Sequence, residues 1–126
     1  MNQSKEIDLS KLSTTESIDQ SVAKEAKNTL NNYSELTTIL AVNTDYQLII
    51  AFKTTQWEKL RLSDHKKEIE NELKQRFPHL EIIVSTDQKI ILELEKIEKA
   101  LSNKQISKKD LYRRINELIR LSKDQA

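Results

Sequence analysis

The chain has 126 residues and a net charge of +1, which fit a single domain without a general attraction for nucleic-acid phosphates. It contains no Cys, which excludes disulfides, thiolate nucleophiles and Cys-based zinc sites, and no Gly, which excludes the Gly-rich loops that hold dinucleotides and nucleoside phosphates. It also lacks the run of about 20 apolar residues that a membrane-spanning helix needs.

The N-terminal residues 1–12 are polar and carry charges of both signs, so we interpret them as a flexible tether and residues 13–126 as a single domain. The segment Ser13–Glu16 has the Ser/Thr-x-x-Glu spacing of a helix start, in which hydroxyl and carboxylate accept hydrogen bonds from free backbone amides. A first helix is predicted from there to about residue 32, with an apolar stripe at every fourth position: Ile18, Val22, Ala26 and Leu30.

Two runs rich in β-branched residues follow, at 36–42 and 46–52, and these predict two strands. The segment between them is short and contains Asn43 and Asp45. Because Asn and Asp are the non-Gly residues that most readily adopt positive φ, we expect these strands to pair as an antiparallel hairpin.

Three helices and one more strand complete the chain. Each predicted helix follows a polar segment that can accept hydrogen bonds from its first amides, and each has an apolar stripe. The expected elements are a helix at 63–77 that Pro78 stops, a strand at 80–84, and a C-terminal helical pair at about 87–121.

This order predicts an α+β fold with an αββαβ core. The simplest packing is a three-stranded mixed sheet backed on one face by the first two helices, with the last two helices as an antiparallel hairpin. The topology resembles KH-type and ring-building modules, but the GxxG loop with which KH domains clamp nucleotides is absent.

The titratable residues indicate no catalytic, cofactor or metal site. His65 has Glu68 three residues later, a spacing that could place two metal ligands on one helix face, but we interpret His65 as a solvent-exposed residue beside a carboxylate. The other histidine, His79, follows Pro78 in a predicted turn. The Glu residues at 68–72 and 93–98 alternate with Lys and are interpreted as solvated helix faces.

Two groups of residues are candidates for binding a partner. The last helix carries Lys and Arg that could face a polyanion, an anionic membrane or an acidic protein, or could simply form its solvated face. Within this group Tyr112 is either an interface anchor or part of the core stripe, and Trp57 is either a binding hot spot or a cover for the sheet edge. The candidate partner-binding residues are therefore Trp57, Lys108, Lys109, Tyr112, Arg113 and Arg114.

Three segments, at 40–52, 77–87 and 109–119, together resemble the YhcN/YlaJ family of sporulation lipoproteins from endospore-forming Bacillus-type bacteria. They read as LAVNTDYQLIIAF, as a helix ending in Phe77-Pro78 followed by a strand ending in VSTD, and as KDLYRRINELI. Members of that family begin with a lipoprotein signal and a lipid-modified Cys, which this sequence lacks, so lipidation would belong to a precursor. The family hairpin also often contains Gly where this chain has Asn43, Thr44 and Asp45.

The resemblance implies a non-catalytic, membrane-anchored domain on the extracytoplasmic face of a spore membrane, with a role in sporulation or germination. It would bind or scaffold a protein partner in the spore envelope, with self-association as a further option and no cofactor. The alternative from the residues alone is a cytosolic KH-like module that binds nucleic acid or the ribosome through its basic last helix. An envelope hydrolase is a third hypothesis, and it would require a cleft with converging carboxylates or histidines.

Overall fold

The computed structural model describes residues 18–55 and 62–124. The predicted tether and the helix start proposed at Ser13–Glu16 lie outside these residues. The elements follow the predicted order: α1 (Ser21–Leu30), β1 (Leu36–Asn43), β2 (Gln47–Thr54), α2 (Leu62–Arg76), β3 (Glu81–Ser85), α3 (Gln88–Ser102) and α4 (Lys108–Asp124).

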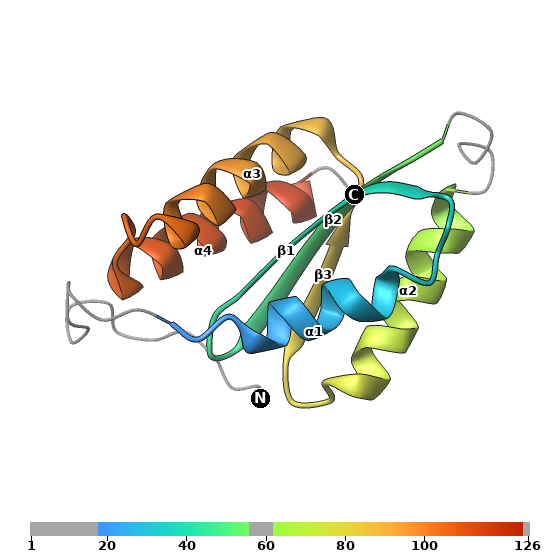
Figure 1. Cartoon of the computed structure of the whole chain (residues 1–126), viewed down its shortest axis with the longest axis horizontal. Helices are drawn as coiled ribbons and strands as arrows, with labels where there is room; N and C mark the ends of the chain where they lie inside the picture. Colours follow the sequence, from blue (N-terminus) through green and yellow to red (C-terminus); the bar gives the residue numbers. More distant parts are fainter. Residues whose placement is uncertain (1–17, 56–61, 125–126) are drawn as a thin grey trace.

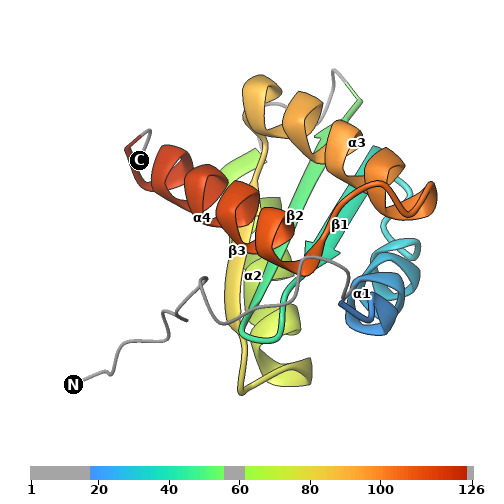
Figure 2. The same ribbon diagram turned by 90° about the vertical axis from the view of Figure 1, so that its left-hand side faces the viewer.

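The strands form one mixed sheet in the order β1-β2-β3, which confirms the predicted α+β class. Strands β1 and β2 are antiparallel and join through a short turn, with Leu40 opposite Ala51 and Asn43 opposite Leu48. Strand β3 lies parallel to β2, because α2 carries the chain back across the sheet between them. This arrangement leaves β1 at one edge and β3 at the other (Figure 2).

Helices cover both faces of the sheet. Helices α1 and α2 lie on one face, as predicted, and α3 and α4 run in opposite directions across the other (Figure 1). The alternation of side chains along β2 supplies both layers, since Leu48 and Ile50 pack with α1 and α2 while Ile49 and Ala51 pack with α3 and α4. The sheet therefore separates two apolar layers, one on each face.

The starts of the last two helices are confirmed. Asp87 accepts hydrogen bonds from the backbone N–H groups of Lys89 and Ile90 at the start of α3. The Ser107 hydroxyl oxygen accepts one from Asp110 N at the start of α4, at 3.1 Å. Both side chains accept hydrogen bonds from backbone N–H groups that would otherwise lack a partner in the first turn of a helix.

The start of the first helix was predicted wrongly. Residues 18–20 are not helical, and α1 begins at Ser21. Ile18 therefore does not belong to the α1 stripe; it packs into the layer formed by α3 and α4 on the opposite face. The fourfold spacing of apolar residues suggested a continuous stripe, but Ala23 rather than Val22 is buried together with Ala26 and Leu30.

Candidate functional site

The β1–β2 turn is closed by a hydroxyl group rather than by positive φ. Among the residues described, only Lys104 has a positive φ outside Gly, at 57°, so the expectation for Asn43 and Asp45 was wrong. Instead, Thr44 Oγ1 accepts hydrogen bonds from Tyr46 N at 3.2 Å and Gln47 N at 3.0 Å. The Thr44 hydroxyl also donates a hydrogen bond to the side-chain oxygen of Gln47. The hydrogen bonds of the Thr44 side chain thus close the turn without a residue at positive φ, the conformation for which Gly would normally be needed.

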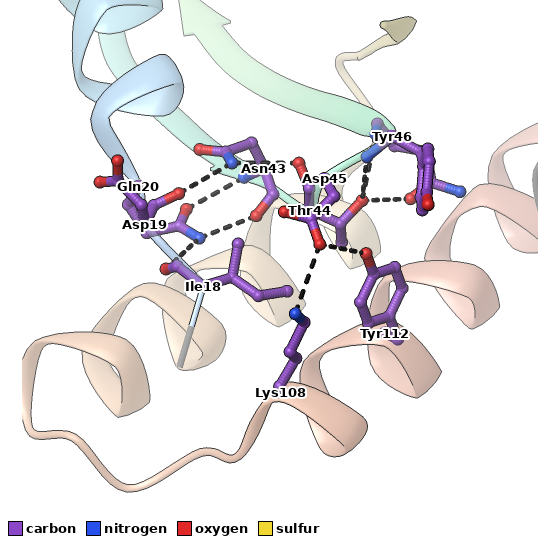
Figure 3. Close-up of polar contacts among 10 residues, drawn as sticks. Ile18, Asp19, Gln20, Asn43, Thr44, Asp45, Tyr46, Lys108 and Tyr112 are labelled. Carbon is purple, nitrogen blue, oxygen red and sulfur yellow. Dashed lines mark hydrogen bonds and ion pairs between the residues drawn. The ribbon is translucent and has the colours of Figure 1, made fainter. Parts of the chain in front are cut away.

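Asn43 joins this turn to the start of α1 (Figure 3). Its Oδ1 accepts a hydrogen bond from Ala23 N at 3.0 Å, which provides the helix cap that the N-cap residue Gln20 does not make with its own side chain. Its Nδ2 donates to Asp19 O at 3.0 Å. Asn43 is only 3% exposed, so these bonds satisfy polar atoms that water does not reach.

Gln20 covers the outer backbone of β1 at the same point. Thr44 N donates a hydrogen bond to Gln47 O, which fixes the alternation along β1: every second residue bonds to β2. Asn43 and Ala41 are among the residues in between, and their backbone groups point away from β2. Gln20 meets both outward groups of Asn43: Oε1 accepts from Asn43 N at 3.0 Å, and Nε2 donates to Asn43 O at 2.7 Å. The side chain therefore imitates one residue of an additional strand.

Glu98 of α3 covers the next outward position. Its Oε2 accepts a hydrogen bond from Ala41 N at 2.8 Å, and both its carboxylate oxygens lie 3.1 Å from Lys27 Nζ. We had interpreted the Glu residues at 93–98 as a solvated face, and for Glu98 this was wrong. The charge is held against the edge of the sheet, and local sequence carries no signal for it because its partners are 57 and 71 residues away.

A groove of about 680 Å³ follows the β1 edge between α1 and α3. Its polar lining consists mainly of Lys24, Lys27 and Lys104 with Glu98, and Ile18 and Leu101 are among its apolar residues. The covered backbone of Ala41 and Asn43 forms part of this edge. A strand from another molecule would have to displace Gln20 and Glu98 before it could bond there.

The β3 edge has no such cover within the described part of the chain. Glu81 N donates to Tyr46 O of the neighbouring chain segment at 2.9 Å, so the backbone groups of Ile82 and Val84 point away from β2. A groove of about 690 Å³ runs along this edge. Its walls are Lys66 and Glu70 of α2 and Ser122 and Lys123 of α4. The outward backbone groups of Ile82 and Val84 thus have no hydrogen-bond partner among the described residues, although both residues are recessed between the groove walls and only 6% exposed.

Tyr112 belongs to the core, which fits the second of its two interpretations. The residue is 1% exposed, and its hydroxyl donates to Asp45 Oδ2 at 2.9 Å. Its ring lies 6.4 Å from that of Tyr46, tilted by 46° (Figure 3). Burial, reinforced by the bond to Asp45, raises the pKa of the Tyr112 phenol. In this position its ring is unavailable to a partner.

The basic residues of α4 are mostly paired with carboxylates. Lys108 Nζ lies 3.5 Å from Asp45 Oδ2 and its side chain is only 21% exposed. Arg113 pairs with the neighbouring Asp110 at 3.0 Å, and Arg114 with Glu93 of α3 at 3.7 Å. Lys109 is half-buried, and Trp57 lies outside the described residues. The structure thus brings Lys108 and Tyr112 together at Asp45 but distributes Lys109, Arg113 and Arg114 along the helix.

The two histidines have different surroundings. His65 is buried at 6% exposure, so the expectation of a solvent-exposed residue was wrong; its Nδ1 lies 3.2 Å from Glu35 Oε2. The spacing to Ile69 and Leu73 places all three on the sheet-facing side of α2, and this pattern could have predicted the burial. His79 is exposed in its turn. Within residues 18–55 and 62–124, no three His, Cys, Asp or Glu side chains gather as metal ligands.

No protein-family model matches this chain, and comparisons with curated proteins and with solved structures found no match either. Within the described ranges, no helix is long and apolar enough to cross a membrane.

Proposed function

We propose that this chain is a non-catalytic protein-binding module that holds a partner along the β3 edge of its sheet. The observation that supports this proposal is the outward-facing backbone of Ile82 and Val84 within a groove of about 690 Å³. An extended segment placed there would add a strand to the sheet, with backbone hydrogen bonds providing affinity and the groove walls providing selectivity.

We further propose that the module acts in the spore envelope, lipid-anchored through a precursor, and supports sporulation or germination as a scaffold. The support for this part is the resemblance of residues 40–52, 77–87 and 109–119 to sporulation lipoproteins. A nucleic-acid partner is less favoured because Lys108, Arg113 and Arg114 each lie within 4 Å of a carboxylate, which weakens their attraction for phosphates.

The test is genetic and uses the outward N–H of Val84. A host strain producing Val84→Pro loses that donor, while the proline is tolerated because the N–H is not needed within the sheet. We expect spores of this strain to germinate as slowly as those of a deletion strain. Val84→Ala keeps the donor but removes buried side-chain volume, so it is the matched control and should germinate as the wild type does.

Protein levels and membrane fractionation complete the experiment. Each variant must accumulate in the spore-membrane fraction to the wild-type level, so that a defect reflects binding rather than loss of the protein. Normal sporulation and germination in the deletion strain would contradict the envelope function. A Val84→Pro strain that behaves as the wild type would contradict binding through the β3 edge.

A further inference from the structure

The β3 edge is suited to a second copy of its own strand. Its outward-facing residues are Ile82 and Val84, placed symmetrically on either side of Ile83. In an antiparallel pair, two residues whose backbone groups face each other exchange two hydrogen bonds. A twofold axis through Ile83 would set Ile82 opposite Val84 of the second copy, and Val84 opposite its Ile82. Both outward residues of both strands would then be satisfied.

Other antiparallel registers satisfy fewer of these groups. An axis through Ile82 would set Val84 opposite position 80 of the second copy, but Leu80 N already donates to Phe77 O at 3.1 Å. An axis through Val84 would set Ile82 opposite Thr86, which lies beyond the end of β3. Of these three axes, only the one through Ile83 sets both Ile82 and Val84 opposite residues that belong to β3 in the second copy.

The charges on the α2 wall of the groove are complementary under the same axis. Lys66 and Glu70 both line the groove and lie four residues apart, so they occupy the same side of α2. A twofold axis perpendicular to the sheet turns the α2 of the second copy antiparallel to the first. We therefore expect Lys66 of each copy to lie opposite Glu70 of the other and to join the ion pair that Glu70 already forms with Lys74 at 3.4 Å.

We propose that this chain forms a twofold dimer through antiparallel pairing of its β3 strands about Ile83, which produces a continuous six-stranded sheet. This inference rests on the proposed use of the β3 edge for binding and names a second copy of the chain as its partner. The β1 edges remain at the two ends of the extended sheet, where Gln20 and Glu98 cover them.

The register predicts which engineered cysteines will form a disulfide. Position 81 of one copy should lie opposite position 85 of the other as a non-hydrogen-bonded pair, with Cα atoms about 4.5 Å apart, which a disulfide can span. The natural chain contains no Cys, so engineered thiols have no competing partners. The probes are two separate proteins, Glu81→Cys and Ser85→Cys, treated with a mild oxidant alone and as an equimolar mixture.

We expect a disulfide-linked dimer in the mixture and little in either protein alone, because positions 81 and 81, or 85 and 85, lie far apart across the axis. Sedimentation velocity of the unmodified chain should show a concentration-dependent shift from monomer to dimer. Equal cross-linking in all three samples, or a chain that stays monomeric at every concentration up to the millimolar range, would overturn the proposal.

The charge pairs provide a test that leaves the strand unchanged. Lys66→Glu or Glu70→Lys places like charges opposite each other twice in the dimer, and each should weaken self-association about tenfold. The double variant restores opposite charges and should recover dimerisation. Lys67→Glu is the matched control, since Lys67 is exposed on the same helix but does not line the groove. Failure of the double variant to recover, or an equal effect of Lys67→Glu, would exclude the Lys66–Glu70 contact and with it this twofold arrangement.

These outcomes are distinguishable from those of the proposed function. If the purified chain is monomeric while Val84→Pro still slows germination as deletion does, the β3 edge binds a different protein and only the dimer is wrong. If the chain dimerises as described while deletion has no effect on spores, the dimer stands and the envelope function is wrong.

Discussion

The outward backbone groups at the two edges of the sheet have different surroundings. At β1, side chains from the segment before α1 and from α3 bond to the backbone: Gln20 to Asn43 and Glu98 to Ala41. At β3, the helices on either side supply only the walls of a groove, and no described side chain bonds to Ile82 or Val84. The comparison teaches that two polar side chains, each reaching the outer backbone of an edge strand, are enough to cover an edge of this small sheet, and that β3 has no equivalent among the described residues.

The chain's connectivity explains why β1 is the covered edge. Gln20 comes just before α1, and α1 packs against β1, so the start of the helix lies beside the end of the strand. Helix α3 also packs mainly on β1, which brings Glu98 to the same edge. On the β3 side, α2 presents Lys66 and Glu70 to the groove, and Glu70 also pairs with Lys74 of the same helix at 3.4 Å.

The largest effect is expected where the β1 edge meets the turn. Asn43→Ala removes the acceptor for Ala23 N, in a buried setting, and the donor to Asp19 O, in a partly buried one. We expect a loss of about 2–4 kcal/mol in the free energy of unfolding, measured by urea denaturation, because buried polar groups remain without partners. Asn28→Ala, on the exposed face of α1, is the control and should change stability by less than about 0.5 kcal/mol. Similar losses for both variants would show that Asn43 does not tie the turn to α1.

Glu98→Ala should make the β1 edge resemble the β3 edge. It removes the acceptor for Ala41 N and leaves Lys27 without its carboxylate, so we expect a loss of about 1–2 kcal/mol in the free energy of unfolding. The newly opened edge should also produce species larger than a dimer in sedimentation velocity. Glu95→Ala, an exposed neighbour on α3, is the control for both readouts. An unchanged size distribution would mean that Glu98 does not protect the edge.

The smallest effect concerns the hydrogen bond between Tyr112 and Asp45, which does not involve the backbone of either edge strand. It serves as a reference for the effects at the two edges. Tyr112→Phe removes the hydroxyl that donates to Asp45, at an expected loss of about 1 kcal/mol at neutral pH. The folded state raises the pKa of this phenol above its ordinary value of about 10, so its contribution is complete below pH about 10 and is lost as pH rises above that value.

The stability difference between wild type and Tyr112→Phe should therefore shrink as pH rises from about 10 to 12. Denaturation curves at several pH values measure it. Tyr33→Phe is a parallel case, because burial and the bond to Glu72 raise the pKa of Tyr33 as well. A difference that stays constant across this range would contradict the pKa shift of Tyr112.

The order of elements could be predicted from the sequence because it depends on local patterns. Periodicity identified the strands and helices, and Asp87 and Ser107 marked two helix starts through bonds to residues two or three positions away. The mixed sheet followed from a hairpin and one helical crossover, which allow few arrangements. These features need no information about distant residues.

The features of the candidate site depend on distant residues, and this is why the sequence did not reveal them. Asn43 caps a helix 20 residues earlier, and Glu98 bonds to a strand 57 residues earlier. No local pattern distinguishes Glu98 from the exposed Glu95 on the same helix. The burial of His65 was predictable from its spacing to Ile69 but was outweighed by the general preference of histidine for the surface.

The Thr44 turn has a consequence for how the hairpin chooses its alignment. In a sheet with one wet face, slippage by one residue would expose apolar side chains, and this penalty selects the correct alignment. Here helices cover both faces of the sheet, so a hairpin whose strand pairing is shifted by one residue would bury nearly as much apolar surface. The choice between the two alignments then depends on polar residues. Only one alignment lets Thr44 accept a hydrogen bond from Gln47 N while Asn43 accepts one from Ala23 N at the start of α1. The few hydrogen bonds at this corner decide which side of each strand every apolar residue occupies.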